Sequence, residues 1–255
     1  MRNILFLFIL SVALCSAQRR QTHSAKAIHP TSTNESPALN DLKFEIRKIS
    51  FKSKKRRKSV SATYAWCTSK GKFAQAFNDS ARVRILQTFE INNKNLKIED
   101  ILKELKKADK KPLTPEERAE LPDIADLYDI TVDSISYRSN KIISLRTYYE
   151  AYYGGIHGIH SYSYINFKPD GTSYTNEELI KNPKKLNALI EKKLRAGADP
   201  ETYPEKVYEP SIVFGFEGEY LVARYMPYEI SSYAAGDIEV KIPIKDINNL
   251  IIDVQ

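Results

Sequence analysis

Alternation of apolar and polar residues predicts β-strands along much of this chain. The clearest case is Val60, Ala62, Tyr64 and Trp66, which alternate with serine, threonine and alanine and so place their larger side chains on one face. Similar patterns predict strands at residues 44–51, 143–153, 161–167, 212–216, 221–225 and 238–242. Turn residues separate them, for example the Pro-Asp-Gly sequence at residues 169–171, which favours reversal of the chain.

Apolar residues spaced by four predict amphipathic helices between these strands. Every fourth residue from Phe73 to Phe89 is apolar, and positions four apart lie on one helical face. Similar spacing predicts helices at residues 98–105, 183–197 and 243–252, and Thr114 followed by Pro115 predicts the start of a short one. This mixture, without strict strand–helix alternation, indicates an α+β fold in which antiparallel sheets with hairpins pack against several amphipathic helices.

The first 17 residues have the pattern of a secretory signal peptide. Arg2 precedes an apolar run at residues 4–14, and small residues follow up to Ala17. The run is shorter than the ~20 residues that span a bilayer. We therefore expect cleavage after Ala17, a flexible linker at residues 18–41, and an exported, periplasmic or extracellular protein. An alternative stays open in which Cys15 is lipidated and the protein is a lipoprotein.

Removal of this signal peptide leaves Cys67 as the single cysteine. An intramolecular disulfide is then excluded, although an exported protein could form one. Because Cys67 follows an alternating strand, we expect a buried small hydrophobe rather than a reactive thiol.

The formal net charge of +7 is concentrated in one short segment. Eight basic residues and no acid lie from Arg47 to Lys58, and they include the run KKRRK at residues 54–58. Such runs are typical of nucleic-acid binding, but the export signal argues against a nucleic-acid partner. The position between two predicted strands suggests a solvated hairpin tip, or a spot that attracts anionic lipid headgroups or cell-wall polymers.

The segment GGIHGIH at residues 154–160 is a candidate for chemistry. Its glycines permit a tight connection, and His157 and His160 could supply two ligands to a metal ion. A zinc site would need at least one more ligand, such as Glu229 or Asp237. This is the hypothesis of a metal-assisted hydrolase that acts on envelope polymers. The alternative is a hairpin loop with accessible histidines. The chain has no HExxH, GxSxG or phosphate-binding glycine motif, and no cofactor is predicted.

Tyrosines crowd both this segment and a later one. Those beside the glycines are Tyr148, Tyr149, Tyr152, Tyr153, Tyr162 and Tyr164, and those in the later segment are Tyr225, Tyr228 and Tyr233. Strand alternation turns about half of them toward the core. The others would form an exposed aromatic face, which suits sugar rings or a protein partner because aromatic side chains offer a large area at low entropic cost.

Two stretches of the sequence resemble a known family. Residues 152–158 (YYGGIHG), followed by a strand that ends in Asn166 and Phe167, are similar to the signature of the RsiV-type extracellular domain. This domain of unknown function is shared by RsiV-like anti-sigma factors and PdaC-type peptidoglycan deacetylases. Residues 224–236 (RYMPYEISSYAAG) look like its second signature, and the sequence Ile-Pro-Ile at 242–244 also agrees. The region from about residue 44 to Tyr153 more loosely resembles the preceding PdaC-associated domain.

The resemblance implies a PdaC-associated α+β domain at residues 42–153 and an RsiV-like α+β domain at residues 154–255. It also implies a binding or sensing module, since the deacetylases carry their chemistry on a separate domain. We therefore expect no enzyme and no anti-sigma role, but an exported noncatalytic module of the bacterial cell envelope without a spanning membrane segment. Its expected ligand is cell-wall glycan or an extracellular protein that acts on it. The expected binding residues are Tyr152, Tyr153, His157, His160, Tyr225, Tyr228 and Glu229.

Overall fold

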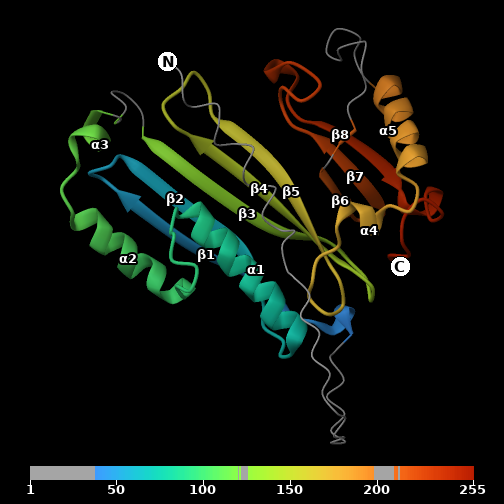
Figure 1. Cartoon of the computed structure of the whole chain (residues 1–255), viewed down its shortest axis with the longest axis horizontal. Coiled ribbons are helices and arrows are strands. Elements are labelled where there is room, and N and C mark those ends of the chain that lie inside the picture. Colours follow the sequence, from blue (N-terminus) through green and yellow to red (C-terminus); the bar gives the residue numbers. More distant parts are fainter. Residues whose placement is uncertain (1–37, 120, 122–125, 198–209, 212) are drawn as a thin grey trace, which may run out of the picture. The chain divides into compact units, whose positions relative to one another are not determined.

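The computed structural model describes residues 38–119, 121, 126–197, 210–211 and 213–255. They form a five-stranded sheet in the order β1-β2-β3-β4-β5 and a three-stranded sheet in the order β6-β7-β8, together with several helices (Figure 1). The prediction of an α+β fold is confirmed. No helix of the described residues is long and apolar enough to cross a membrane.

The predicted signal peptide, Cys15 and the predicted linker up to residue 37 lie outside the described residues. The last residues of that linker are part of the folded domain, because Leu39–Asp41 forms a short 3-10 helix and Leu39 is buried. Arg138 holds this segment by donating from Nε to the carbonyl of Leu39 at 2.9 Å.

The five-stranded sheet joins an N-terminal hairpin to three antiparallel strands. Its strands are β1 (Phe44–Ser53), β2 (Lys58–Cys67), β3 (Leu127–Arg138), β4 (Ile143–Tyr152) and β5 (Ile159–Phe167). The predicted hairpin around the basic run is confirmed, since β1 and β2 pair antiparallel along their whole length. Only β2 and β3 are parallel, and a parallel pair needs a long crossover. Residues 68–126 provide it, and their described part contains three helices.

The crossover helices are α1 (Lys72–Thr88), α2 (Ile98–Lys110) and α3 (Pro115–Ala119). The predicted apolar face of α1 is confirmed, and Phe73, Phe77 and Ile85 are each at most 4 % exposed. Phe73 and Phe77 pack against buried residues of β2, β4 and β5. Cys67 belongs to the same cluster and is 2 % exposed, as predicted for a small buried hydrophobe, and burial raises the pKa of its thiol.

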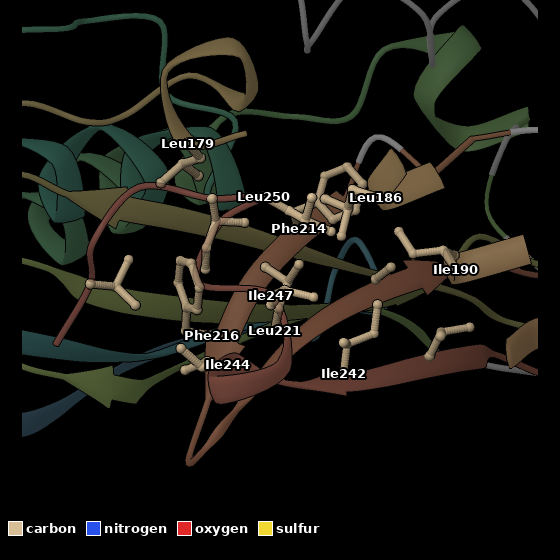
Figure 2. Packing of buried hydrophobic residues seen from close by; sticks show 14 of the residues in the cluster. Leu179, Leu186, Ile190, Phe214, Phe216, Leu221, Ile242, Ile244, Ile247 and Leu250 are labelled. Atoms are coloured by element: carbon tan, nitrogen blue, oxygen red, sulfur yellow. The ribbon is translucent and has the colours of Figure 1, made fainter. Parts of the chain in front are cut away.

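The three-stranded sheet has its own core. Its elements are α4 (Asn176–Leu179), α5 (Pro183–Gly197), β6 (Val213–Glu217), β7 (Tyr220–Tyr225) and β8 (Ile238–Pro243). Leu186 and Ile190 of α5 lie in one cluster with Phe214, Phe216 and Ile242 of the sheet (Figure 2). This arrangement confirms the predicted helix at residues 183–197 and the predicted strands of this region.

The predicted helix at residues 243–252 is wrong. Only Ile244–Asp246 is helical, as a single 3-10 turn. The carbonyl of Leu250 instead accepts hydrogen bonds from the backbone N–H groups of Lys181 and Asn182. Ile244, Ile247, Leu250 and Ile251 are all buried, so the helix-like spacing reflects burial of an irregular segment rather than a helical face.

The two sheets meet through an unusually close contact between β5 and β6. Gly215 of β6 lies against the ring of Tyr164 of β5, so closely that a Cβ atom at residue 215 would overlap the ring. Two hydrogen bonds reinforce the contact. The side-chain N–H of Asn166 donates to the carbonyl of Phe214 at 3.1 Å, and the N–H of Phe216 donates to the Ser144 hydroxyl at 3.1 Å.

A buried ionic network surrounds this contact, which we call the inter-sheet joint. Arg224 of β7 donates from Nε to the Tyr164 hydroxyl at 2.7 Å and pairs with Glu217 at 3.1 Å and with Glu239. Its guanidinium also lies 4.2 Å from the ring centroid of Tyr162. Arg224 is 7 % exposed, and a buried cation is tolerated only when it is paired and hydrogen-bonded. The network therefore fixes how β5 and β7 face each other.

The predicted domain boundary between residues 153 and 154 falls in the connection between β4 and β5. These strands pair antiparallel from Ile143 to Ala151 within the same sheet. The five-stranded sheet thus contains residues from both sides of the predicted boundary.

A buried carboxylate stabilises the helix-covered side of the sheet. Asp129 of β3 is 2 % exposed. It accepts hydrogen bonds from the hydroxyls of Tyr149 at 2.7 Å and Tyr153 at 2.5 Å, and it forms an ion pair with Lys58 at 2.9 Å. Burial, the contact between the two hydroxyls and the bond to Asp129 raise the pKa of Tyr149, while burial and Asp129 raise the pKa of Tyr153 to about 12.

We expect Gly215→Ala to destabilise the protein because the new methyl group must displace the Tyr164 ring. Overpacking of this kind lowers the free energy of unfolding by about 1–3 kcal/mol. Urea denaturation followed by circular dichroism measures it. Gly197→Ala is the matched control, since a Cβ atom there meets nothing within 4 Å. Equal stabilities of the two variants would contradict the close packing at the joint.

We also expect the protein to lose stability in alkali. A pKa raised in the folded state stabilises the fold below the unfolded tyrosine pKa of about 10, and this stabilisation is lost as the pH rises toward the folded-state pKa. Tyrosinate absorbance should therefore rise at higher pH in the folded chain than in urea. Superimposable titration curves in the two states would show that Tyr149 and Tyr153 are not held as described.

Candidate functional site

Two loops that are far apart in sequence contact each other beside the inter-sheet joint. One joins β4 to β5 and contains the segment GGIHGIH, and the other joins β7 to β8. The His157 ring stacks on the Tyr233 ring with centroids 3.8 Å apart, and the Tyr233 hydroxyl donates to the carbonyl of Gly158 at 3.1 Å. The two stretches singled out from the sequence therefore form one continuous structure.

The loop between β4 and β5 is closed by hydrogen bonds to its own backbone. The Tyr152 hydroxyl donates to the carbonyl of Gly155 at 2.9 Å, and Nδ1 of His157 lies 2.8 Å from the carbonyl of Gly158. A side chain at residue 158 would approach the carbonyl of Ala151 to 3.1 Å, so glycine allows the loop to pack closely against β4. Ile156 at the tip is fully exposed.

The loop between β7 and β8 is held in a tight turn. The N–H of Met226 donates to the Glu229 carboxylate at 2.8 Å, and the N–H of Tyr228 donates to the carbonyl of Ser231 at 3.1 Å. Tyr228 has a φ angle of 72°, which is uncommon for a large side chain and marks stored strain. Tyr228 is 68 % exposed, and its ring centroid lies 5.6 Å from that of Tyr233.

Aromatic side chains from three parts of the chain make up the feature that we call the aromatic surface, in which His157 and Tyr228 are exposed and the other rings are partly buried. Tyr128 of β3 stacks on Tyr152 of β4 with ring centroids 6.1 Å apart. The Tyr128 hydroxyl also lies near Gly158, whose carbonyl binds Tyr233, so the two groups of rings are neighbours. The members of the aromatic surface are Tyr128, Tyr152, His157, Tyr228 and Tyr233.

Two carboxylates lie beside the aromatic surface. Glu150 accepts hydrogen bonds from the hydroxyls of Tyr128 at 2.8 Å and Tyr148 at 3.0 Å. The bond to Glu150 is the main cause of the raised pKa of Tyr128, while burial and then Glu150 raise that of Tyr148. Nε2 of His160 lies 2.8 Å from Asp237, each side chain being about one-fifth exposed. This pair links β5 to the residue that precedes β8.

The structure separates the seven predicted binding residues into groups. Tyr152, His157 and Tyr228 belong to the aromatic surface, while His160 and Glu229 support its loops through Asp237 and Met226. Tyr153 points to the opposite side of the sheet, where it binds Asp129. Tyr225 is 2 % exposed and lies in the core of the second sheet.

Sequence reasoning missed Tyr128 and Glu150 as parts of this site. Tyr128 becomes the neighbour of Tyr152 through the pairing of β3 with β4, and Glu150 is opposite His160 in the pairing of β4 with β5. Strand alternation alone indicates which residues share a face within one strand. It does not give the register between strands, which brings these side chains together.

The two histidines do not share a ligand position. His157 contacts Tyr233 and Gly158, whereas His160 contacts Asp237. Among the described residues, no three His, Cys, Asp or Glu side chains are grouped as a metal site requires. The described residues therefore do not fit a zinc centre.

Comparisons with known proteins find a family model that matches part of the chain and solved structures with a similar fold. Residues 176–245, which run from α4 into the turn after β8, match the DUF3298 family of proteins of unknown function. This supports the expected family domain of unknown function in the C-terminal part. The narrower resemblance to RsiV-like and PdaC-type proteins, including the PdaC-associated N-terminal domain, stays a prediction. Among curated proteins, none matches the sequence.

Two crystal structures have a similar fold. A DUF3298 family member from Bacteroides fragilis is 16 % identical over 85 % of this chain and 96 % of that chain, with a TM-score of 0.66. A DUF3298 family protein from Pseudomonas aeruginosa is 13 % identical over 84 % of this chain and 96 % of that chain, with a TM-score of 0.53. At these identities the likeness concerns the fold alone, and it extends beyond residues 176–245 to most of this chain.

Proposed function

We propose that this chain is an exported, noncatalytic binding or sensing module of the bacterial cell envelope. Its ligand would be cell-wall glycan, or a protein that acts on it, bound at the aromatic surface. The observation that carries the proposal is the contact between His157 and Tyr233, which joins two distant loops into one exposed structure. Export rests on the N-terminal sequence pattern.

The chemistry of the aromatic surface suits a sugar or a protein partner. Tyr152 and Tyr228 combine flat apolar rings with polar hydroxyls, and such side chains bury a large area while losing few rotamers. Glu150 and Asp237 lie beside them and offer acceptors for hydroxyl or amide groups. Loops that are already held by hydrogen bonds lose little entropy on binding.

The same contacts favour binding over catalysis. The imidazole of His157 is stacked on Tyr233 and hydrogen-bonded to a carbonyl. The hydrogen bond to Glu150 is the main cause of the raised pKa of Tyr128, whereas burial and then Glu150 raise the pKa of Tyr148. Raised pKa values oppose formation of a tyrosinate nucleophile. The alternative of a metal-assisted hydrolase that uses His157 and His160 remains as an outcome of the experiment below.

The proposal predicts that the chain sediments with insoluble, fluorescently labelled peptidoglycan without releasing soluble label. Tyr228→Ala and Tyr152→Ala should each weaken binding at least about tenfold, as expected when a central aromatic contact is removed. Tyr220→Ala is the control for Tyr228→Ala, because Tyr220 is also exposed, at 40 %, but lies on the hairpin between β6 and β7.

Soluble label released in a manner that depends on His157 and His160 would favour the hydrolase instead. Binding that all three tyrosine variants retain would reject the aromatic surface as the binding site. If the protein stays in solution and the polymer stays intact, peptidoglycan is not the ligand. The proposal that the aromatic surface binds cell-wall glycan then fails.

A further inference from the structure

Several cations of the basic segment pair with acids that are distant in sequence. These pairs, at 3.2–3.4 Å, are Arg56 with Asp109, and Lys52 and Arg57 with Asp126. The acids of these pairs are partly exposed. Lys58, the last cation of the segment, is different because one of its two acidic partners is buried in the sheet.

The amine of Lys58 lies between two carboxylates of different burial. Its Nζ atom lies 2.8 Å from Oε1 of Glu90 and 2.9 Å from Oδ2 of Asp129. Glu90 lies just after α1 and is exposed, whereas Asp129 is 2 % exposed. Lys58 begins β2, whose parallel pairing with β3 starts at this residue. The sheet therefore holds the amine against the buried carboxyl group.

The two oxygens of Asp129 have different surroundings. Oδ1 accepts hydrogen bonds from the hydroxyls of Tyr149 at 2.7 Å and Tyr153 at 2.5 Å. Oδ2 is buried, and among the residues that the structure describes none donates a hydrogen bond to it, since its contact with Lys58 is an ion pair without hydrogen-bond geometry. A buried ion pair stabilises a fold well only when its remaining lone pairs are satisfied. A buried oxygen without a donor points instead to a chemical role.

We propose that Lys58 and Asp129 condense to an intramolecular amide that cross-links β2 to β3. Glu90 takes a proton from the Lys58 ammonium, and the lone pair of Nζ then attacks Cγ of Asp129 to form the C–N bond. The bond between Cγ and Oδ2 breaks, and Oδ2 leaves as water with two protons that both come from Nζ. The ammonium and the carboxylate thus yield one amide and one water, without oxidant, cofactor or second substrate.

The surroundings of Asp129 suit each part of this step. The amine is held about 3 Å from the carboxyl group, which replaces a bimolecular encounter by a local one. Negative charge develops on Oδ1, where two hydroxyls already donate, as in an oxyanion hole. Burial and Asp129 raise the pKa of Tyr153 to about 12, so its hydroxyl keeps the proton that it donates. Burial of Asp129 also keeps water from hydrolysing the amide.

Glu90 has a defined task because Lys58 is protonated in its resting state. Burial lowers the pKa of Lys58, but the hydrogen bonds and charges of Glu90 and Asp129 outweigh it and raise the pKa. An ammonium has no lone pair for the attack, so a base must remove a proton first. Glu90 contacts Nζ and is the exposed carboxylate of the two, which makes it the proton acceptor.

Mass spectrometry of the purified full chain under denaturing conditions tests the proposal. After proteolysis, the peptides that contain Lys58 and Asp129 should be recovered as one species, lighter than their sum by one water. Lys58→Arg keeps a cation but removes the amine, so the cross-linked species should be absent. Glu90→Gln should slow its formation at least about a hundredfold, as expected when a general base is lost.

Lys52→Arg is the matched control, since Lys52 belongs to the same segment but pairs with the half-exposed Asp126. It should leave the cross-link intact. Separate peptides of full mass in the wild-type chain, or a loss of water that persists in Lys58→Arg, would overturn the proposal. Formation at an unchanged rate in Glu90→Gln would contradict the proposed step. Circular dichroism checks that the variants fold, and the wild-type peptide masses decide the question even where a variant does not.

Discussion

The contact between Gly215 and the ring of Tyr164 is the constraint on which the arrangement of this domain depends. A strand can approach an aromatic ring this closely only where it has no side chain. The Tyr164 hydroxyl then accepts a hydrogen bond from Arg224, which also pairs with Glu217 and Glu239. Because these groups are buried, each must keep its partners, and the two sheets have little freedom to slide against each other.

The inter-sheet joint has a consequence for the loops beside it. β5 follows the glycine-rich loop, and β7 precedes the loop that carries Tyr228 and Tyr233. With β5 and β7 fixed through Tyr162, Tyr164 and Arg224, these loops meet and the aromatic surface forms between them. The shape of the surface is therefore set by contacts in the interior rather than by either loop alone.

Much of the fold could be predicted because burial leaves a periodic pattern in sequence. Strand β2 and helix α1 follow their predicted periods closely. Residues 243–252 show the limit, since buried isoleucines in an irregular segment mimic a helical face. Tyr225 shows a second limit of such patterns. It lies in β7, the central strand of a sheet that is covered on both faces, and nearly every residue of this strand is buried.

The site could be predicted only in part. Tyr152, His157 and Tyr228 stood out because tyrosines and glycines crowd locally, but the role of Tyr128 depends on strand register and that of Glu229 on a turn that binds its carboxylate. The ion pairs of the basic segment could not be predicted for a similar reason. The acids that neutralise it lie 32 to 74 residues away in sequence, and only the crossover between β2 and β3 brings them together.

The central claim is that the two loops form one surface before any ligand binds. Nuclear Overhauser effects between the ring protons of His157 and Tyr233, measured in the free protein, test it most directly. With centroids 3.8 Å apart, we predict strong cross-peaks between the rings and ring-current shifts at His157. Absence of these cross-peaks, together with random-coil shifts for Tyr233, would show that the loops are separate in solution and would contradict the account.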